Sequence, residues 1–416
     1  MDTFAVKPLK RKLSSFLRRF YSSIKTAPSR RHFRTYIQGQ LSNLERKSIE
    51  PMALAAGVPP RSLQEFVEIH RWEHEKLRTR LQEVVRTEHG DAQAMGVIDE
   101  TSYPKQGDQT AGVQPQYCGA TGKTDNCVVT VHLGYATEHF HTLIDSDLFL
   151  PEQTWSQDRQ RCRQAGIPDE VVYRPKWRIA LELLQRTWQQ GVRFAYLLAD
   201  EEYGRCHTFR QEVASYEGLS YMVEVPCSLR GWTKRPPVLA PNAGGSTGGR
   251  PRPRPRLAAW APAARGVQRL WQRGGPSWET FHVKETAKGP VVWEVRASRF
   301  YPGEDGLPGA EQWLLIARNV LTGEVKYFLS NAPADTPLTA LVQVAFSRWH
   351  IERMFEDAKG QVGLDHFEVR HYQPLMRHLI LSMVSLLFLM RETQQAAKKK
   401  DIVECTPSAA DHRRAA

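Results

Sequence analysis

Two aspartates that lie far apart in the chain each follow a short apolar run. Asp99 ends the run AMGVID, and Asp200 ends VRFAYLLAD. Both runs predict buried strands, and ligand sites in open α/β sheets lie outside the carboxyl ends of the strands. Carboxylates at such an edge can hold hard divalent cations, which prefer oxygen ligands. An aspartate in this position is more often a turn residue or a helix cap, so the pair alone leaves both interpretations open.

A third acid follows on a predicted helix. Arg348, Glu352 and Lys359 are spaced by four and seven residues, which places them within about 40° of one helical stripe. A helix facing a sheet edge could therefore add one carboxylate and two cations to the aspartates. Three carboxylates suit a pair of metal ions about 4 Å apart, which can clamp an in-line phosphoryl displacement. The alternative is ordinary salt bridging on a solvated helix face.

The segments around these acids resemble a known family. GVIDETSYPKQG, LLADEEYG and SRWHIERMFEDAKGQVGLDHFEVR are similar to the three acidic motifs of bacterial insertion-sequence transposases of the DDE superfamily. The last segment resembles the Tyr-x2-Arg-x3-Glu-x6-Lys signature of that group, with Arg348, Glu352 and Lys359 in the matching positions. Ala345 stands where the signature has Tyr. Further similar blocks follow in the same order, so the resemblance covers roughly residues 30 to 390.

The resemblance implies a catalytic mechanism and its cofactors. Asp99, Asp200 and Glu352 would be the catalytic residues and would hold two Mg²⁺ ions, for which Mn²⁺ can substitute. Hydrolysis would cut the DNA at the ends of the element, and the freed 3′ hydroxyl would then attack target DNA. Glu356, one turn after Glu352, is the main rival for the third acid, but it does not occupy the Glu position of the signature.

Basic residues near the motifs are candidates for DNA contacts. The resemblance assigns Arg348 and Lys359 to phosphate binding, and Lys105, six residues after Asp99, is a further candidate. In the N-terminal part, the pattern from Glu45 to Trp72 resembles a helix-turn-helix, with a turn at Gly57 and Ser62 as the cap of the second helix. Arg61 and Arg71 could meet phosphates there. A plain helical hairpin is the alternative.

The elements that must position these residues indicate an α/β fold with a ribonuclease-H-like core, a mixed sheet flanked by helices. One long helix is expected with Asp335 or Thr336 as its cap, Pro337 in its first turn and its end near Gly360 or Gly363, and a second helix from about Pro374 to Arg391. Five parts are predicted: a helical DNA-binding region (1–90), the first part of the core (91–227), a β-rich insertion with a basic Pro/Gly/Arg loop (228–332), the second, helical part of the core (333–392) and a flexible tail (393–416).

Composition agrees with a nucleic-acid partner. The formal net charge is +12 and the pI is about 9.4, and lysines and arginines that meet phosphates release counterions. The expected partners are double-stranded DNA, as terminal inverted repeats and as target, and a second copy of the chain in a homodimer on the DNA ends. The six scattered cysteines form no C-x-x-C pair and give no zinc signature.

No membrane span or secretory signal is expected. The most apolar stretch, Leu379 to Met390, is shorter than the roughly 20 residues that a bilayer needs and predicts a buried helix instead. The protein is therefore expected in the bacterial cytoplasm, associated with the nucleoid. Two alternatives to a transposase remain: a catalytically inactive, domesticated DNA-binding protein, which Ala345 and the Arg-Pro loop keep open although all three acids are present, and a host nuclease with the same core.

Overall fold

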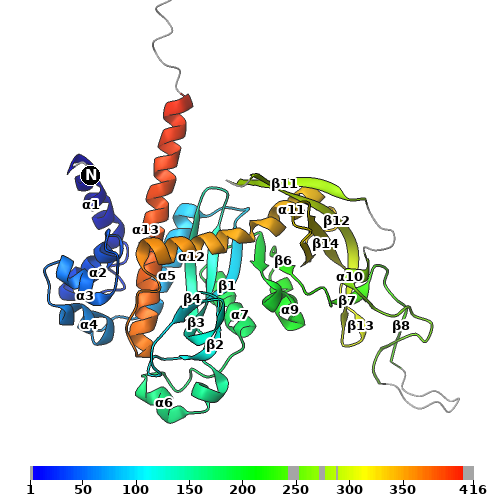
Figure 1. The fold of residues 1–416 in the computed structure, drawn as a ribbon, viewed down its shortest axis with the longest axis horizontal. Coiled ribbons are helices and arrows are strands. Elements are labelled where there is room, and N and C mark those ends of the chain that lie inside the picture. The colour runs from blue at the N-terminus through cyan, green and yellow to red at the C-terminus, as the bar shows by residue number, and fades with distance from the viewer. Residues whose placement is uncertain (1–2, 242–252, 271–276, 287–288, 406–416) are drawn as a thin grey trace, which may run out of the picture. The chain divides into compact units, whose positions relative to one another are not determined.

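The computed structural model describes residues 3–241, 253–270, 277–286 and 289–405 (Figure 1). They form two compact units, the first from residues 1–94, 99–193 and 350–416 and the second from residues 95–98 and 194–349. Part of the predicted basic loop, residues 242–252, and residues 406–416 of the predicted tail lie outside the described residues. The predicted boundary at residue 227 falls inside the second unit.

The first unit begins with five helices. Thr26 caps the second of them, since its hydroxyl accepts from the Ser29 backbone N–H at 3.3 Å. Gly57, with φ of 67°, makes the predicted turn between the third and fourth helices. Ser62 does not cap the fourth helix as predicted, because that helix already starts at Pro60. The helices are α1 (Thr3–Arg18), α2 (Ala27–Gln40), α3 (Ile49–Ala55), α4 (Pro60–Glu68) and α5 (His74–His89).

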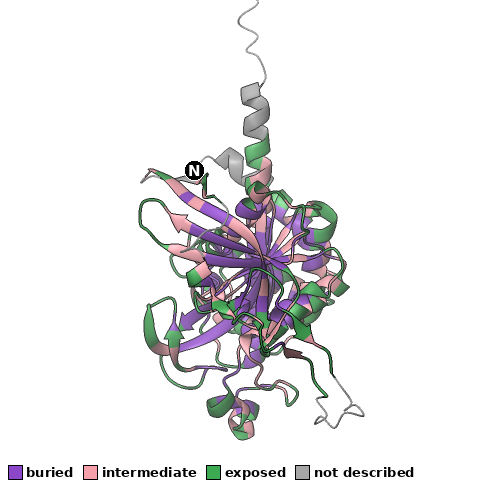
Figure 2. Cartoon of the chain, turned by 90° about the vertical axis from the view of Figure 1, so that its right-hand side faces the viewer, coloured by how far each residue is buried: buried purple, intermediate pink, exposed green. Residues whose placement is uncertain are grey.

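The strands of the first unit are centred on a long hairpin. The hairpin strand β3 (Lys123–Ala136) pairs antiparallel with β2 (Gln114–Cys118) and with β4 (His141–Leu148), and its other neighbour is β1 (Met95–Pro104). Helix α7 (Lys176–Gln189) packs on β3 and β4. Two short helical segments lie between β4 and α7, a π-helical turn (Glu152–Ser156) and α6 (Arg159–Gln164). The strands β3 and β4 are buried along most of their length, and buried residues are purple in Figure 2.

The C-terminal helix α13 (Tyr372–Cys405) packs on α2, α4, α5 and β4 and is buried in its first half. It is long and apolar enough to cross a membrane, but its apolar window is 89% buried inside the protein, as in a core helix. Buried polar contacts tie it to α2: Tyr36 Oη lies 2.8 Å from His378 Nδ1, and Gln40 Nε2 donates to Ser382 Oγ at 2.7 Å. Residues 393–405 of the predicted tail continue this helix.

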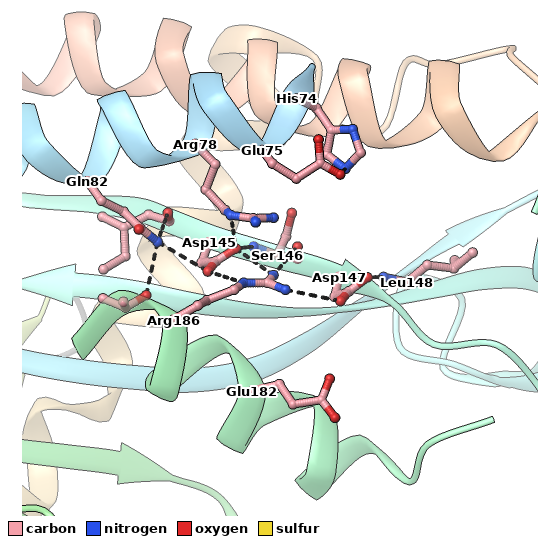
Figure 3. A network of polar contacts seen from close by, with 12 residues as sticks. His74, Glu75, Arg78, Gln82, Asp145, Ser146, Asp147, Leu148, Glu182 and Arg186 are labelled. Atoms are coloured by element: carbon pink, nitrogen blue, oxygen red, sulfur yellow. Dashed lines mark hydrogen bonds and ion pairs between the residues drawn. The ribbon is translucent and has the colours of Figure 1, made fainter. Parts of the chain in front are cut away.

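A buried ionic network joins β4 to α5 and α7 (Figure 3). Arg186 of α7 donates to both oxygens of Asp145, at 2.6 and 2.7 Å, and reaches Asp147 at 3.3 Å. Gln82 of α5 also donates to Asp145, at 3.1 Å. Burial acts to raise the pKa of Asp147, but Arg186 and Arg174 outweigh burial and hold that pKa below its usual value. Asp147 stays charged inside the fold because these cations accompany it.

The second unit is a mixed sheet. The first residues of β1 pair in parallel with β5 (Tyr196–Ala199), and β5 pairs in parallel with β6 (Ser220–Glu224). Antiparallel strands then follow from β6 through β15 (Val325–Ser330) and β14 (Gln312–Asn319) to β12 (Gly289–Glu304). The strands of the predicted β-rich insertion therefore extend the sheet of β5 and β6. The remaining strands are β7 (Arg230–Trp232), β8 (Val238–Leu239), β9 (Arg256–Leu257), β10 (Arg265–Gly266), β11 (Glu279–Thr286) and β13 (Leu307–Pro308).

Helices cover this sheet as well, and one of them differs from the prediction. Helices α8 (Glu201–Gly204), α9 (His207–Ala214) and α11 (Leu338–Ala345) pack on β5 or β6, and α10 (Val267–Leu270) is a single turn. The long helix begins at Leu338 with Pro337 in the cap position, where Asp335 or Thr336 was predicted. It is also interrupted, since a 3-10 turn (Phe346–Arg348) separates α11 from α12 (Trp349–Val362). Parallel and antiparallel strands with flanking helices fit the predicted ribonuclease-H-like core.

Candidate active site

Asp99 lies inside a strand and does not end it. The strand β1 continues to Pro104, because Thr101, Ser102 and Tyr103 are buried and keep the extended conformation. The predicted end of this strand at Asp99 is therefore wrong. One oxygen of the Asp99 carboxylate accepts the Glu100 backbone N–H at 2.8 Å, and the side chain is partly exposed. A carboxylate at this point of the strand can face a ligand.

Asp200 follows its strand as predicted and also caps a helix. Its Oδ1 accepts the backbone N–H groups of Glu202 at 2.9 Å and Tyr203 at 3.4 Å, at the start of α8. Gly204 ends this short helix against β6, where an added Cβ would overlap the carbonyl oxygen of Glu224. The turn after Asp200 is therefore fixed by a helix cap on one side and by a close backbone contact on the other.

Glu352 lies in the first turn of α12 and is exposed. The predicted stripe is only partly present, because Arg348 belongs to the 3-10 turn and to the second unit, whereas Glu352 and Lys359 belong to the first. Ala345, the residue in the Tyr position, is buried at the end of α11. The rival acid Glu356 is exposed and lies 3.5 Å from Arg353.

The rotation of α12 about its axis is set by contacts on its buried side. Met354 packs against Gly134 of β3, where an added Cβ would lie 2.5 Å from the Met354 sulfur. Asp357 is buried and lies 3.2 Å from Nε2 of His141 at the start of β4. Arg353 of α12 also donates to Asp357, at 3.1 Å. These contacts hold one side of the helix on the hairpin and leave Glu352 exposed.

The two lysines predicted to bind phosphate are half-buried. Lys105 donates to the Phe367 carbonyl oxygen at 2.7 Å, and its ammonium lies 3.5 Å from the centre of the Phe367 ring. Burial lowers the pKa of Lys105 to about 8. Burial also lowers the pKa of Lys359, whose ammonium lies 5.7 Å from the centre of the Tyr103 ring. Lys105 thus connects the end of β1 to the segment before α13.

The N-terminal candidates Arg61 and Arg71 are both exposed. Arg61 forms an ion pair with Glu65, one turn later on α4, at 2.8 Å. The apolar side of α4, formed by Leu63, Phe66 and Val67, is buried as the predicted helical spacing requires. Helices α2, α3 and α4 pack on one another, so the exposed side of α4 is presented by a three-helix cluster.

The ability of Asp99, Asp200 and Glu352 to hold a metal ion is judged from their grouping and their ligand type. Among the described residues, no three His, Cys, Asp or Glu side chains form a group that could hold a metal ion. Asp99 and Glu352 belong to the first unit and Asp200 to the second. All three are carboxylates, which is the ligand type that Mg²⁺ and Mn²⁺ prefer. The donor set therefore fits a hard divalent cation, and the trio remains a prediction.

Comparison with known proteins decides the family. Residues 19–290 match the family model described as DDE superfamily endonuclease, a span that contains Asp99 and Asp200 and ends before Glu352. The chain belongs to the DDE superfamily of endonucleases. A probable transposase of insertion sequence element IS701 from Microchaete diplosiphon is 32% identical over 191 residues. That alignment covers 45% of this chain and 46% of the relative, so the chain spans about half of the relative's length. Members of this superfamily use divalent metal ions and act on DNA.

The sequence did not reveal two features of this DDE-superfamily chain. One is the ionic network of Asp145 and Asp147, and the other is the contact of Asp357 with His141. Their partners lie far away in sequence: Arg186 is 41 residues from Asp145, and Asp357 is 216 residues from His141. The only sequence signal of the ionic network is the pair Asp145 and Asp147 inside the otherwise apolar run HTLIDSDLFL. Two acids this close together are also typical of a turn.

Proposed function

We propose that this protein is a transposase that binds the ends of its insertion sequence, cleaves the DNA there and joins the 3′ ends to target DNA. Its membership of the DDE superfamily and its similarity to a probable transposase support this function. Terminal inverted repeats and target DNA would be its substrates. A homodimer would hold the two ends together, and the protein would act in the bacterial cytoplasm on the nucleoid.

The observation that carries the proposal is the parallel register of β1 and β5. Met95 pairs with Tyr196 and Val97 pairs with Leu198. Asp99 comes two residues after Val97, and Asp200 comes two residues after Leu198. Both aspartates thus follow the paired segment at the same interval. This equal spacing supports a common role in metal binding for the two aspartates.

Within this proposal each residue has a defined role. Asp99, Asp200 and Glu352 would hold two Mg²⁺ ions, and Mn²⁺ can substitute. Such ions supply positive charge that stabilises the displacement at phosphorus. Lys359, Arg348 and Lys105 would hold DNA phosphates near the acids, and Arg61 and Arg71 would hold phosphates at the N-terminal helices.

In the first reaction, water attacks a phosphodiester at the end of the element, and the 3′ oxygen leaves as a hydroxyl. In the second reaction, that 3′ hydroxyl attacks a phosphodiester of target DNA, and a new 3′ hydroxyl leaves from the target. One phosphodiester is formed for each that is broken in this second step, so joining needs no external energy source.

Cleavage of DNA that carries the element's ends tests the proposal. In Mg²⁺, Asp99→Ala, Asp200→Ala and Glu352→Ala should each lower the cleavage rate at least about 100-fold, which corresponds to about 2.7 kcal/mol. Glu356→Ala is the matched control on the same helix and should cut normally. The assignment of the third acid is wrong if Glu352→Ala cuts normally and Glu356→Ala does not. The enzyme proposal fails if wild-type protein binds the ends without cutting them, which would favour a domesticated DNA-binding protein.

A further inference from the structure

A polar cavity of about 480 Å³ lies in the first unit, between α6 (Figure 1), the loop after β1 and the segment before α13. Its volume falls within the range of ~300–1,000 Å³ that is usual for small-molecule sites. None of the candidate catalytic or phosphate-binding residues lines this cavity. The cavity is therefore separate from the candidate active site, and the chemistry of its lining indicates what it can bind.

One wall of the cavity is a guanidinium group that lies over an indole ring. Arg161 lies 3.9 Å above the centre of the Trp155 ring. Its Nη1 donates to the Thr154 carbonyl oxygen and its Nη2 to the Asp108 carbonyl oxygen, both at 2.7 Å. The indole is buried and is fixed by its own N–H, which donates to the Val113 carbonyl oxygen at 2.7 Å. Two hydrogen bonds and the contact with the indole thus hold the guanidinium group in place before any ligand arrives.

The rest of the lining carries both signs of charge. Arg370 supplies a second guanidinium, and Asp108 and Asp158 supply carboxylates. Gln160 and Gln164, one turn apart on α6, supply amides that can both donate and accept. Such a lining suits a ligand that has an anion and also N–H donors. A simple anion would be repelled by the carboxylates, and a metal ion would be repelled by the guanidinium groups.

A nucleotide has this combination of groups. Its phosphate accepts from guanidinium groups, its base offers N–H and carbonyl edges to amides and carboxylates, and its flat base can stack on an arginine plane. We propose that this cavity binds one nucleotide of a DNA strand, with the unpaired base stacked on Arg161 and the phosphate at Arg370. The inference rests on the proposed function for DNA as the partner, and a free nucleotide shares the same chemistry.

Binding of single-stranded DNA tests the cavity in the full-length protein. The probe is a fluorescein-labelled oligodeoxyadenylate of 12 nucleotides, followed by fluorescence anisotropy at one fixed salt concentration. Arg161→Lys keeps the charge and removes the stacking plane, and Gln164→Trp fills the cavity without disturbing the contacts of Arg161. Each should weaken binding at least about fivefold. Arg163→Gln, an exposed position on the same helix that does not line the cavity, should bind like wild type.

A second experiment uses dAMP as a competitor and distinguishes a nucleotide of a DNA strand from a free nucleotide as the ligand. Displacement of the oligonucleotide from wild type by millimolar dAMP, lost in Gln164→Trp, supports the proposal. Tight binding of dAMP, with oligonucleotide binding unchanged in every variant, would assign the cavity to a free nucleotide and overturn the DNA strand as its source. Unchanged binding of both probes in both cavity variants would overturn the site. Normal cleavage of element ends by such variants would leave the proposed function intact.

Discussion

The two units use charged side chains in different ways. In the first unit Arg186 meets Asp145 and Asp147 on β4, and both carboxylates are almost completely buried. In the second unit Arg318 of β14 meets Glu294 of β12 at 2.5 Å, but the two side chains keep 41% and 30% of their exposure. Buried ion pairs cost several kcal/mol to break by removing one partner, whereas exposed pairs are worth about 0–1 kcal/mol. The network on β4 is therefore needed for the stability of its surroundings, whereas the Arg318–Glu294 pair is a surface contact.

The largest expected effect comes from removing one paired arginine from each unit, which tests the difference between the two units. Arg186→Leu should lower the stability of the first unit by about 3–5 kcal/mol, because two buried carboxylates lose their main cation. Arg318→Leu, its matched control, should cost less than about 1 kcal/mol. Hydrogen exchange measured by mass spectrometry follows β4 and β14 separately and reports each effect in its own unit. Equal losses from the two substitutions would contradict the comparison.

Mild acid provides a second test, because the first unit also buries neutral imidazoles. Burial lowers the pKa of His378 to about 4. The unfolded chain binds this proton near its ordinary pKa of about 6.5, so stability is complete above that pH and is lost as the pH falls towards 4. The expected loss is about 3 kcal/mol from this residue. Urea unfolding between pH 7 and pH 4 measures it.

His378→Gln keeps a hydrogen-bond donor and acceptor and removes the titration, so its stability should change less over the same pH range. A wild-type stability that stays level between pH 7 and pH 4 would show that His378 is not buried in its neutral form.

The smallest expected effect comes from a substitution that changes packing in the first unit and leaves charge unchanged. Gly134→Ala adds a methyl group against Met354 and should cost about 1–3 kcal/mol. It should also slow DNA cleavage, because it moves the helix that carries Glu352. Gly360→Ala on the same helix is the matched control, since an added Cβ there meets nothing within 4 Å. It should be neutral or slightly stabilising. Equal cleavage rates in the two variants would show that the contact with Gly134 does not position α12.

The sequence predicted those parts of the fold that depend on local pattern. Asp200 follows its strand as expected, because the run before it is apolar and the capping geometry after it is local. The end of β1 could not be predicted from local pattern. Thr101 and Ser102 have the polar side chains of surface residues, but packing buries them and the strand continues past Asp99. The break at Phe346–Arg348 was also missed, because the apolar residues continue through it at helical spacing. The ionic network could not be predicted, since residues far apart in the chain complete it.

The position of α13 near the C-terminal end of the chain has a consequence for folding during synthesis. Tyr36 and His378, which meet inside the first unit, are separated by 342 residues. At the usual rate of ~5–20 residues per second, roughly 20–70 seconds pass between their appearance from the ribosome. During that interval α2, α3 and α4 can pack on one another, but the sides of α2 and α4 that contact α13 stay uncovered. The N-terminal helices therefore complete their packing late, and the nascent chain is a target for chaperones until α13 has been made.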